Sequence, residues 1–288
     1  MTATAVDEYP VFLPASTGEL LGVVTEPPGR PNGLAAVFLR GAGWRPSSGP
    51  RRTQVSAARR LADQGFHALR FSYHGLAESG GTGDEIVRLD RLYVADARAA
   101  LDWAAERDLR PVLVGNCFGA RTALATAAKV PGAVAGLVLS VPPVFDFEVV
   151  RRRDRRPLRH FARRLRPSHV LAVLRSRTRR RALGRTGRGL VDIAGRKVRP
   201  RSGDGPEWVS RRFLAHLDAV VDQGIPTLFV FGEEDRYYED FQHAGILDRA
   251  GLQASVAVVP GRVHGLTSVA TQDAALDAID AWAAATWR

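Results

Sequence analysis

The chain of 288 residues is long enough for one large domain with an insertion, but short for two complete enzyme domains. Apolar residues make up 45% of it, so a substantial core can form. There is no run of 18 apolar residues, and residues 1–10 contain two acids and no apolar run, so we expect neither a membrane span nor a signal peptide. Cys117 is the single cysteine, which excludes an internal disulfide and a cysteine-based metal cluster and favours a reducing, cytoplasmic location.

The net charge of +11 is unevenly distributed along the chain. Residues 151–212 contain 21 arginines and one lysine against four acids, so this segment carries +18 and the remainder carries −7. Any electrostatic partner is therefore expected to bind this segment.

Hydrophobic patterning predicts strands that alternate with helices on both sides of this arginine-rich segment. The expected strands are 10–13, 20–25, 34–39, 67–73, 111–114, 134–141, 227–231 and 255–259. The expected helices are 52–64, 92–107, 120–128, 238–250 and 267–287. Strands separated by helices form mostly parallel sheets covered on both faces. We therefore predict an α/β domain with a mostly parallel eight-stranded sheet, formed by residues 1–145 and 217–288, with an insertion at 146–216.

The pentapeptide Gly115-Asn116-Cys117-Phe118-Gly119 joins a predicted strand to a predicted helix. A glycine-flanked nucleophile in such a turn is held in strained geometry at the top of a sheet, at a helix N-terminus that favours a thiolate. A small buried cysteine in a tight turn is the alternative. Cys117 is our candidate nucleophile.

Two further candidates follow later strands. Asp235 comes after the strand at 227–231, and His264 comes after the strand at 255–259. In this order, His264 can act as general base and acid, and Asp235 can fix its tautomer. Asp146 and Asp240 are alternative acids. The other histidines show no metal-ligand spacing, and we expect neither a metal nor a cofactor.

Taken together, these features resemble the α/β-hydrolase superfamily over about residues 10–145 and 220–288. Leu39-Arg40-Gly41-Ala42-Gly43 is similar to the L-H-G-x-G segment of that family, with Arg40 in place of histidine. Residues 71–80 resemble its D-x-x-G-x-G-x-S segment. The resemblance implies an α/β-hydrolase fold, a lid at the insertion, and an oxyanion hole formed by the backbone N–H groups of Phe118 and Ala42.

Cysteine in place of the usual serine narrows the expected chemistry. An acyl-enzyme on sulfur is a thioester, which forms readily from another thioester or an activated ester. Cysteine members of the family include enzymes that resemble thioesterases and dienelactone hydrolases. We expect a thioesterase or acyltransferase, with a role in secondary metabolism as one setting for it. A lyase that eliminates an acyl group such as acetate, a small-ester or lactone hydrolase, and a non-catalytic binding protein are the alternatives.

The basic insertion suggests a partner for this chemistry. Acyl carrier proteins and coenzyme A present acidic surfaces or phosphates next to a thioester, and a basic rim would steer them to the site. A solvated arginine-rich surface is the alternative. We expect no nucleic-acid partner, because the segment has few aromatic residues and the rest of the chain carries a complete set of catalytic residues. The sequence does not indicate an oligomeric state.

Overall fold

The computed structural model describes residues 7–16, 18–41, 47–81, 92–146, 208–249, 251–266 and 268–287. The expected oxyanion donor Ala42 and nearly all of the arginine-rich segment lie outside these residues. No helix in the described ranges is long and apolar enough to cross a membrane.

Eight strands form one sheet in the order β1-β2-β4-β3-β5-β6-β7-β8. Their bounds are β1 Glu8–Ala15, β2 Gly18–Thr25, β3 Leu34–Leu39, β4 His67–Phe71, β5 Arg110–Asn116, β6 Gly136–Ser140, β7 Thr227–Gly232 and β8 Ala254–Val259. The pairs β1–β2 and β2–β4 are antiparallel, and all the others are parallel. The predicted α/β-hydrolase fold with a mostly parallel eight-stranded sheet is confirmed.

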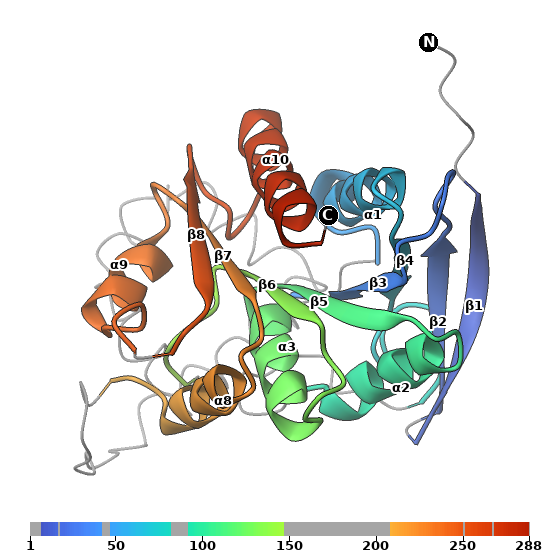
Figure 1. Cartoon of the computed structure of the whole chain (residues 1–288), viewed down its shortest axis with the longest axis horizontal. Helices are drawn as coiled ribbons and strands as arrows, with labels where there is room; N and C mark the ends of the chain where they lie inside the picture. The colour runs from blue at the N-terminus through green and yellow to red at the C-terminus, as the bar shows by residue number, and fades with distance from the viewer. Residues whose placement is uncertain are drawn as a thin grey trace, which may run out of the picture. The chain divides into compact units, whose positions relative to one another are not determined.

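Helices cover both faces of this sheet (Figure 1). The helices are α1 Thr53–Asp63, α2 Val94–Ala105, α3 Phe118–Lys129, α8 Arg211–Asp222, α9 Arg236–His243 and α10 Val269–Thr286, and a short 3-10 helix, η1, spans Pro50–Arg52. Helices α1 and α10 lie on one face, and α2, α3 and α8 lie on the other (Figure 1). This two-sided cover explains why every residue of β3 and of β7 is buried, and why these strands appear as continuous apolar runs in the sequence.

The chain divides into two compact units, a core unit formed by residues 1–144 and 209–288 and a second unit formed by residues 145–208. The expected insertion extended to residue 216, whereas α8 begins at Arg211 and packs on α3 as part of the core unit. Phe213, Leu217 and Val220 form its buried stripe, at a spacing typical of a helix. The arginines at the start of α8 continue the arginine-rich segment, which explains the difference.

The two core segments on either side of the second unit are bonded to each other. The backbone N–H of Ser210 donates to the carbonyl of Val144 at 2.8 Å. The buried guanidinium of Arg121 donates to the carbonyl of Pro143 at 2.9 Å and to Oγ of Ser210 at 3.3 Å. Because Ser210 also caps α8, through Phe213 N–H at 3.2 Å, Arg121 fixes both of these segments to α3.

Helix α9 differs from the sequence expectation of 238–250. It begins at Arg236, directly after Asp235, and it ends at His243. Gly245 follows with a φ of 61°, a left-handed conformation that glycine adopts without strain and that stops helices.

The turn between β5 and α3 depends on two glycines that permit close packing. A Cβ at Gly115 would lie 2.4 Å from the carbonyl carbon of Gly119. A Cβ at Gly119 would lie 2.1 Å from the carbonyl oxygen of Leu39, at the end of β3. Backbone atoms cannot yield as a flexible side chain can, so hydrogen is the only side chain that fits here.

Replacing Gly119 with alanine is therefore expected to destabilise the protein. Alanine is normally preferred to glycine inside a helix by about 1 kcal/mol, but here overpacking against β3 should cost about 3 kcal/mol or more. Denaturant unfolding of Gly119→Ala measures this. Gly29→Ala is the matched control, because no atom lies within 4 Å of a Cβ there, and it should change stability by less than about 0.5 kcal/mol. Equal stability of the two variants would contradict the packing argument.

Candidate active site

Cys117 lies at the N-terminus of α3, directly after β5. Its backbone has φ 51° and ψ −109°, a conformation that L-residues seldom adopt and that is typical of strained functional turns. Two backbone hydrogen bonds stabilise this conformation. The N–H of Cys117 donates to the carbonyl of Ser140 at 2.8 Å, and its carbonyl accepts from the N–H of Arg121 at 3.2 Å. The residue is partly buried, and it retains some access to solvent.

Asp235 follows β7 and is 4% exposed, whereas the neighbouring acids Glu233 and Glu234 are exposed. Its Oδ2 accepts hydrogen bonds from the backbone N–H groups of Gly232 at 2.9 Å and Val263 at 2.8 Å. The N–H of His264 donates to both carboxylate oxygens, at 3.3 and 3.2 Å. The carboxylate therefore joins the end of β7 to the loop that carries His264.

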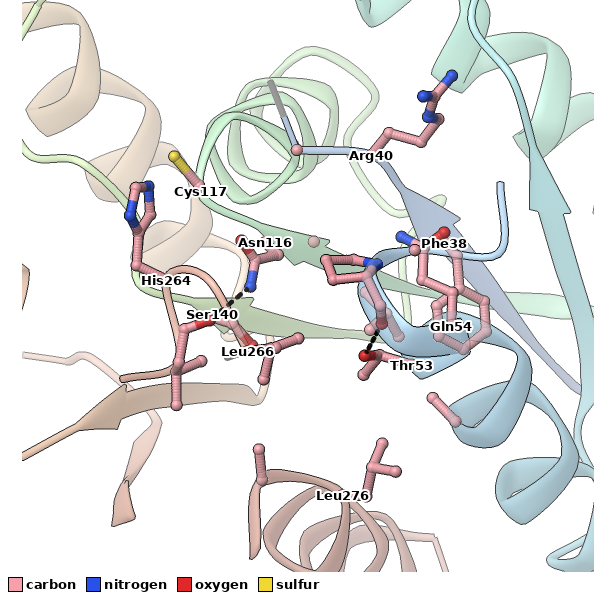
Figure 2. Close-up of a pocket in the computed structure, with 18 of the residues that line it drawn as sticks. Phe38, Arg40, Thr53, Gln54, Asn116, Cys117, Ser140, His264, Leu266 and Leu276 are labelled. Carbon is pink, nitrogen blue, oxygen red and sulfur yellow. Dashed lines mark hydrogen bonds between the residues drawn. The ribbon is translucent and has the colours of Figure 1, made fainter. Parts of the chain in front are cut away.

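His264 extends from this loop toward Cys117, and both residues line one cavity (Figure 2). The imidazole packs against the ring of Tyr237, with 4.8 Å between the ring centroids. Among the described residues, no hydrogen bond joins the imidazole to Sγ of Cys117 or to the Asp235 carboxylate. Catalytic hydrogen bonds are often loose in a ligand-free site and tighten when substrate binds.

The electrostatics of the site favour a neutral resting state. Burial raises the pKa of Cys117 to about 11, although a hydrogen bond from Phe118 N–H and the charge of Arg121 act in the opposite direction. Partial burial lowers the pKa of His264 from its ordinary value of 6.5, and the charge of Asp235 opposes this change. A thiol and a neutral imidazole therefore face the cavity near pH 7. The stabilisation of a thiolate expected at this helix N-terminus is outweighed by desolvation.

The structure describes one of the two expected oxyanion donors. The N–H of Phe118 is the first of α3, and it acts to lower the pKa of the Cys117 thiol against the effect of burial. Ala42 lies outside the described residues, but Gly41 before it lines the cavity. Arg40 is only 3% exposed, and burial lowers its pKa. The hydroxyl of Tyr73 donates to the carbonyl of Arg40 at 3.4 Å, so the end of β3 is also joined to the end of β4.

The cavity has a volume of about 340 Å³. Asn116 and Ser140 border it next to Cys117. The side-chain amide of Asn116 donates to the carbonyl of Val263 at 3.4 Å, which joins the turn after β5 to the loop of His264. Helices α1 and α10 contribute further lining residues, as do β3, β5 and the loop after β8. The sequences of the two helices indicated only buried helical faces.

The other acids and histidines lie elsewhere. Asp146 falls in the second unit, and Asp240 is buried within α9. His74 pairs with the fully buried Asp96 through Nδ1 at 2.9 Å, and its backbone N–H also donates to that carboxylate at 2.8 Å. Neither residue of this pair lines the cavity, and the double contact fixes the loop after β4 to α2.

Comparisons with known proteins agree with this architecture. An esterase from Pyrococcus furiosus has a TM-score of 0.61 at 12% identity, covering 98% of this chain and 92% of its own. The Est1E protein of Butyrivibrio proteoclasticus, solved with ferulic acid bound, has a TM-score of 0.61 at 16% identity, covering 96% of this chain and 98% of its own. A dienelactone hydrolase from Anabaena variabilis has a TM-score of 0.55 at 15% identity, covering 98% and 99%. At such low identity, these likenesses establish the fold.

The family is established by a sequence model. No curated protein matches the chain. The model for serine aminopeptidase, S33, matches residues 51–268, which include Cys117, Asp235 and the loop of His264. The family is described by its serine enzymes, whereas this chain has cysteine in the turn after β5. The chain therefore belongs to the serine aminopeptidase S33 family of hydrolases, with the α/β-hydrolase fold.

Proposed function

We propose that the protein is a cysteine-dependent acyl hydrolase or acyltransferase, which accepts the acyl group of a thioester or activated ester on Sγ of Cys117. One observation carries the proposal: Cys117 occupies the strained turn at the N-terminus of α3 and shares a cavity with His264. Membership in a hydrolase family supports the reaction class.

In the proposed reaction, His264 acts first as base and then as acid. As Sγ attacks the carbonyl carbon, the imidazole takes the thiol proton, because the thiol is not ionised beforehand. The N–H of Phe118 stabilises the negative oxygen that forms, with Ala42 as the proposed second donor. The tetrahedral intermediate then collapses, and the leaving group departs with the proton from His264. Water or another acceptor releases the acyl group by the same steps in reverse.

Asp235 has two roles in this proposal. Its three backbone hydrogen bonds hold the loop so that the imidazole faces Cys117. Its negative charge raises the pKa of His264 and so stabilises the imidazolium that forms as the proton moves.

The preference for thioesters follows from sulfur chemistry. Exchange of one thioester for another is nearly neutral in free energy, whereas acylation of a thiol by an ordinary ester or amide is uphill. Transfer from a carrier protein or coenzyme A remains part of the proposal, supported by the +18 charge of residues 151–212. Small activated esters and lactones are accepted on the same chemical grounds.

Incubation with an acyl thioester is expected to give a covalent adduct on Cys117. Intact-mass analysis should show one added acyl group in the wild-type protein and none in Cys117→Ala, which lacks the only thiol of the chain. Hydrolysis in labelled water should place solvent oxygen in the released acid. An alkene product without solvent oxygen would instead indicate elimination. Full activity of Cys117→Ala would remove the basis of the proposal.

The dependence of acylation on pH is expected to follow the two shifted groups. The pKa of His264 is lowered, so the base is available above an acidic limb centred below pH 6.5. The pKa of Cys117 is raised to about 11, so no further change should occur until strongly alkaline pH. Steady-state kinetics across this pH range measure the acidic limb. Thiolate absorbance of the wild type, compared with that of Cys117→Ser, measures the alkaline limb. Full thiolate absorbance at pH 7 would show that an ion pair forms instead.

Replacing Asp235 with asparagine is expected to slow acylation at least about a hundredfold, because the imidazolium loses its negative neighbour. The amide nitrogen also cannot accept from a backbone N–H, and one unsatisfied donor should cost about 1–3 kcal/mol of stability. Asp240→Asn, at an equally buried acid, and Asp146→Asn serve as controls and should keep most of the activity. Rates are compared well below each melting temperature. Loss confined to Asp146→Asn or Asp240→Asn would reassign the acid.

A further inference from the structure

The cavity at Cys117 extends away from the sulfur, between the sheet and the two helices on one face. Thr53 and Ala57 of α1 and Leu276 and Ile279 of α10 form its far walls. In Figure 2, Leu276 lies across the cavity from Cys117 and His264. Cys117 therefore lies at one end of a partly open cavity, and an apolar helix face lies at the other.

Aliphatic side chains form a large part of the described wall of this space. Val114, Val263, Leu266, Leu276 and Ile279 line it, and each is at most 8% exposed. Among the polar lining residues, Oε1 of Gln54 is buried with no hydrogen-bond partner in the described part of the chain, whereas two others use their side chains within the protein. The hydroxyl of Thr53 donates to the carbonyl of Pro50, and the amide of Asn116 donates to the carbonyl of Val263. A ligand in this space would gain mainly from burial of apolar surface.

Small side chains in the two helices leave this space unfilled. Ala57 of α1 and Ala275 of α10 both line the cavity. The helices contact each other elsewhere, where Arg60 of α1 forms ion pairs with Asp277 and Asp280 of α10. These ion pairs hold the two helices together beside the cavity. The space lined by Ala57 and Ala275 is therefore a fixed feature of the fold.

We propose that this cavity is an acyl-binding site that selects an unbranched alkyl chain of medium length. The inference rests on the proposed acylation of Cys117 and specifies the acyl group. At roughly 30 Å³ for each water-sized or methylene-sized group, about 340 Å³ accommodates about ten such groups. An acyl chain of about six to ten carbons, with its carbonyl at Cys117 and its methyl end near Leu276, fills it. An acetyl group leaves most of it empty.

The proposal is tested by filling the cavity from its walls. Ala57→Leu and Ala275→Leu are expected to slow acylation of Cys117 by octanoyl N-acetylcysteamine at least about tenfold, because one or two misplaced methylenes are worth about that much in a specificity pocket. Acylation by acetyl N-acetylcysteamine should change less than about threefold. Ala285→Leu makes the same change on the exposed side of α10 and should leave both rates unchanged.

The melting temperature of the leucine variants and the chain-length preference of a variant with a larger cavity are two independent tests. Added leucines that occupy free space should not lower the melting temperature, whereas leucines forced into a packed core should. Leu276→Ala should shift the preferred acyl chain toward dodecanoyl. If the octanoyl and acetyl rates fall together in the leucine variants, or if neither falls, the cavity does not select the chain. A wild-type preference for phenylacetyl over octanoyl thioester would also overturn the proposal.

A binding measurement separates this inference from the proposed function. Calorimetry with sodium octanoate on Cys117→Ala should detect binding, and adding Ala57→Leu should weaken it about tenfold. If octanoate binds in this way but no thioester acylates the wild type, the cavity is an alkyl site and the proposed function is wrong. If thioesters acylate Cys117 but octanoate does not bind and octanoyl is not preferred, the acyl-chain inference is wrong.

Discussion

The close packing of α3 against the ends of β3 and β5 is the constraint on which the site depends. Gly115 and Gly119 bring backbone within a distance that no Cβ could occupy, and the turn between them forces Cys117 into a strained conformation. The same turn places the N–H of Phe118 near the sulfur and brings Asn116 to the His264 loop. The position of Cys117 is therefore set by sheet geometry and not by the conformation of its own side chain.

That packing also decides the chemistry of the sulfur. A cysteine enclosed this closely loses hydration, and this loss raises the pKa of the thiol. The N–H of Phe118 and the charge of Arg121 lower that pKa by less. In our proposal the site therefore works more like a serine site than a thiolate site, because the thiol needs His264 to remove its proton. In the same proposal sulfur changes the acyl intermediate, which becomes a thioester, and leaves the resting side chain uncharged.

The sequence predicted the fold because its buried strands are continuous apolar runs and its candidate residues follow them directly. Parallel strands end at one edge, so Cys117, Asp235 and His264 could be assigned to that edge from chain position alone. Helix α8 was missed because its arginines obscured a three-residue apolar stripe. The contacts of Asp235 with three backbone amides and the bonds of Arg121 to Pro143 and Ser210 join distant segments, and no local pattern encodes them.

The location of the cavity separates two parts of substrate recognition. Every described residue that lines it belongs to the core unit, and in our proposal this unit recognises the acyl chain. In our proposal the charge of the arginine-rich segment acts on the leaving group, which carries phosphate or acidic surface in a coenzyme A or carrier-protein thioester. Because an apolar wall is insensitive to salt and a basic surface is not, raising the ionic strength should weaken recognition of the carrier while leaving chain-length preference intact.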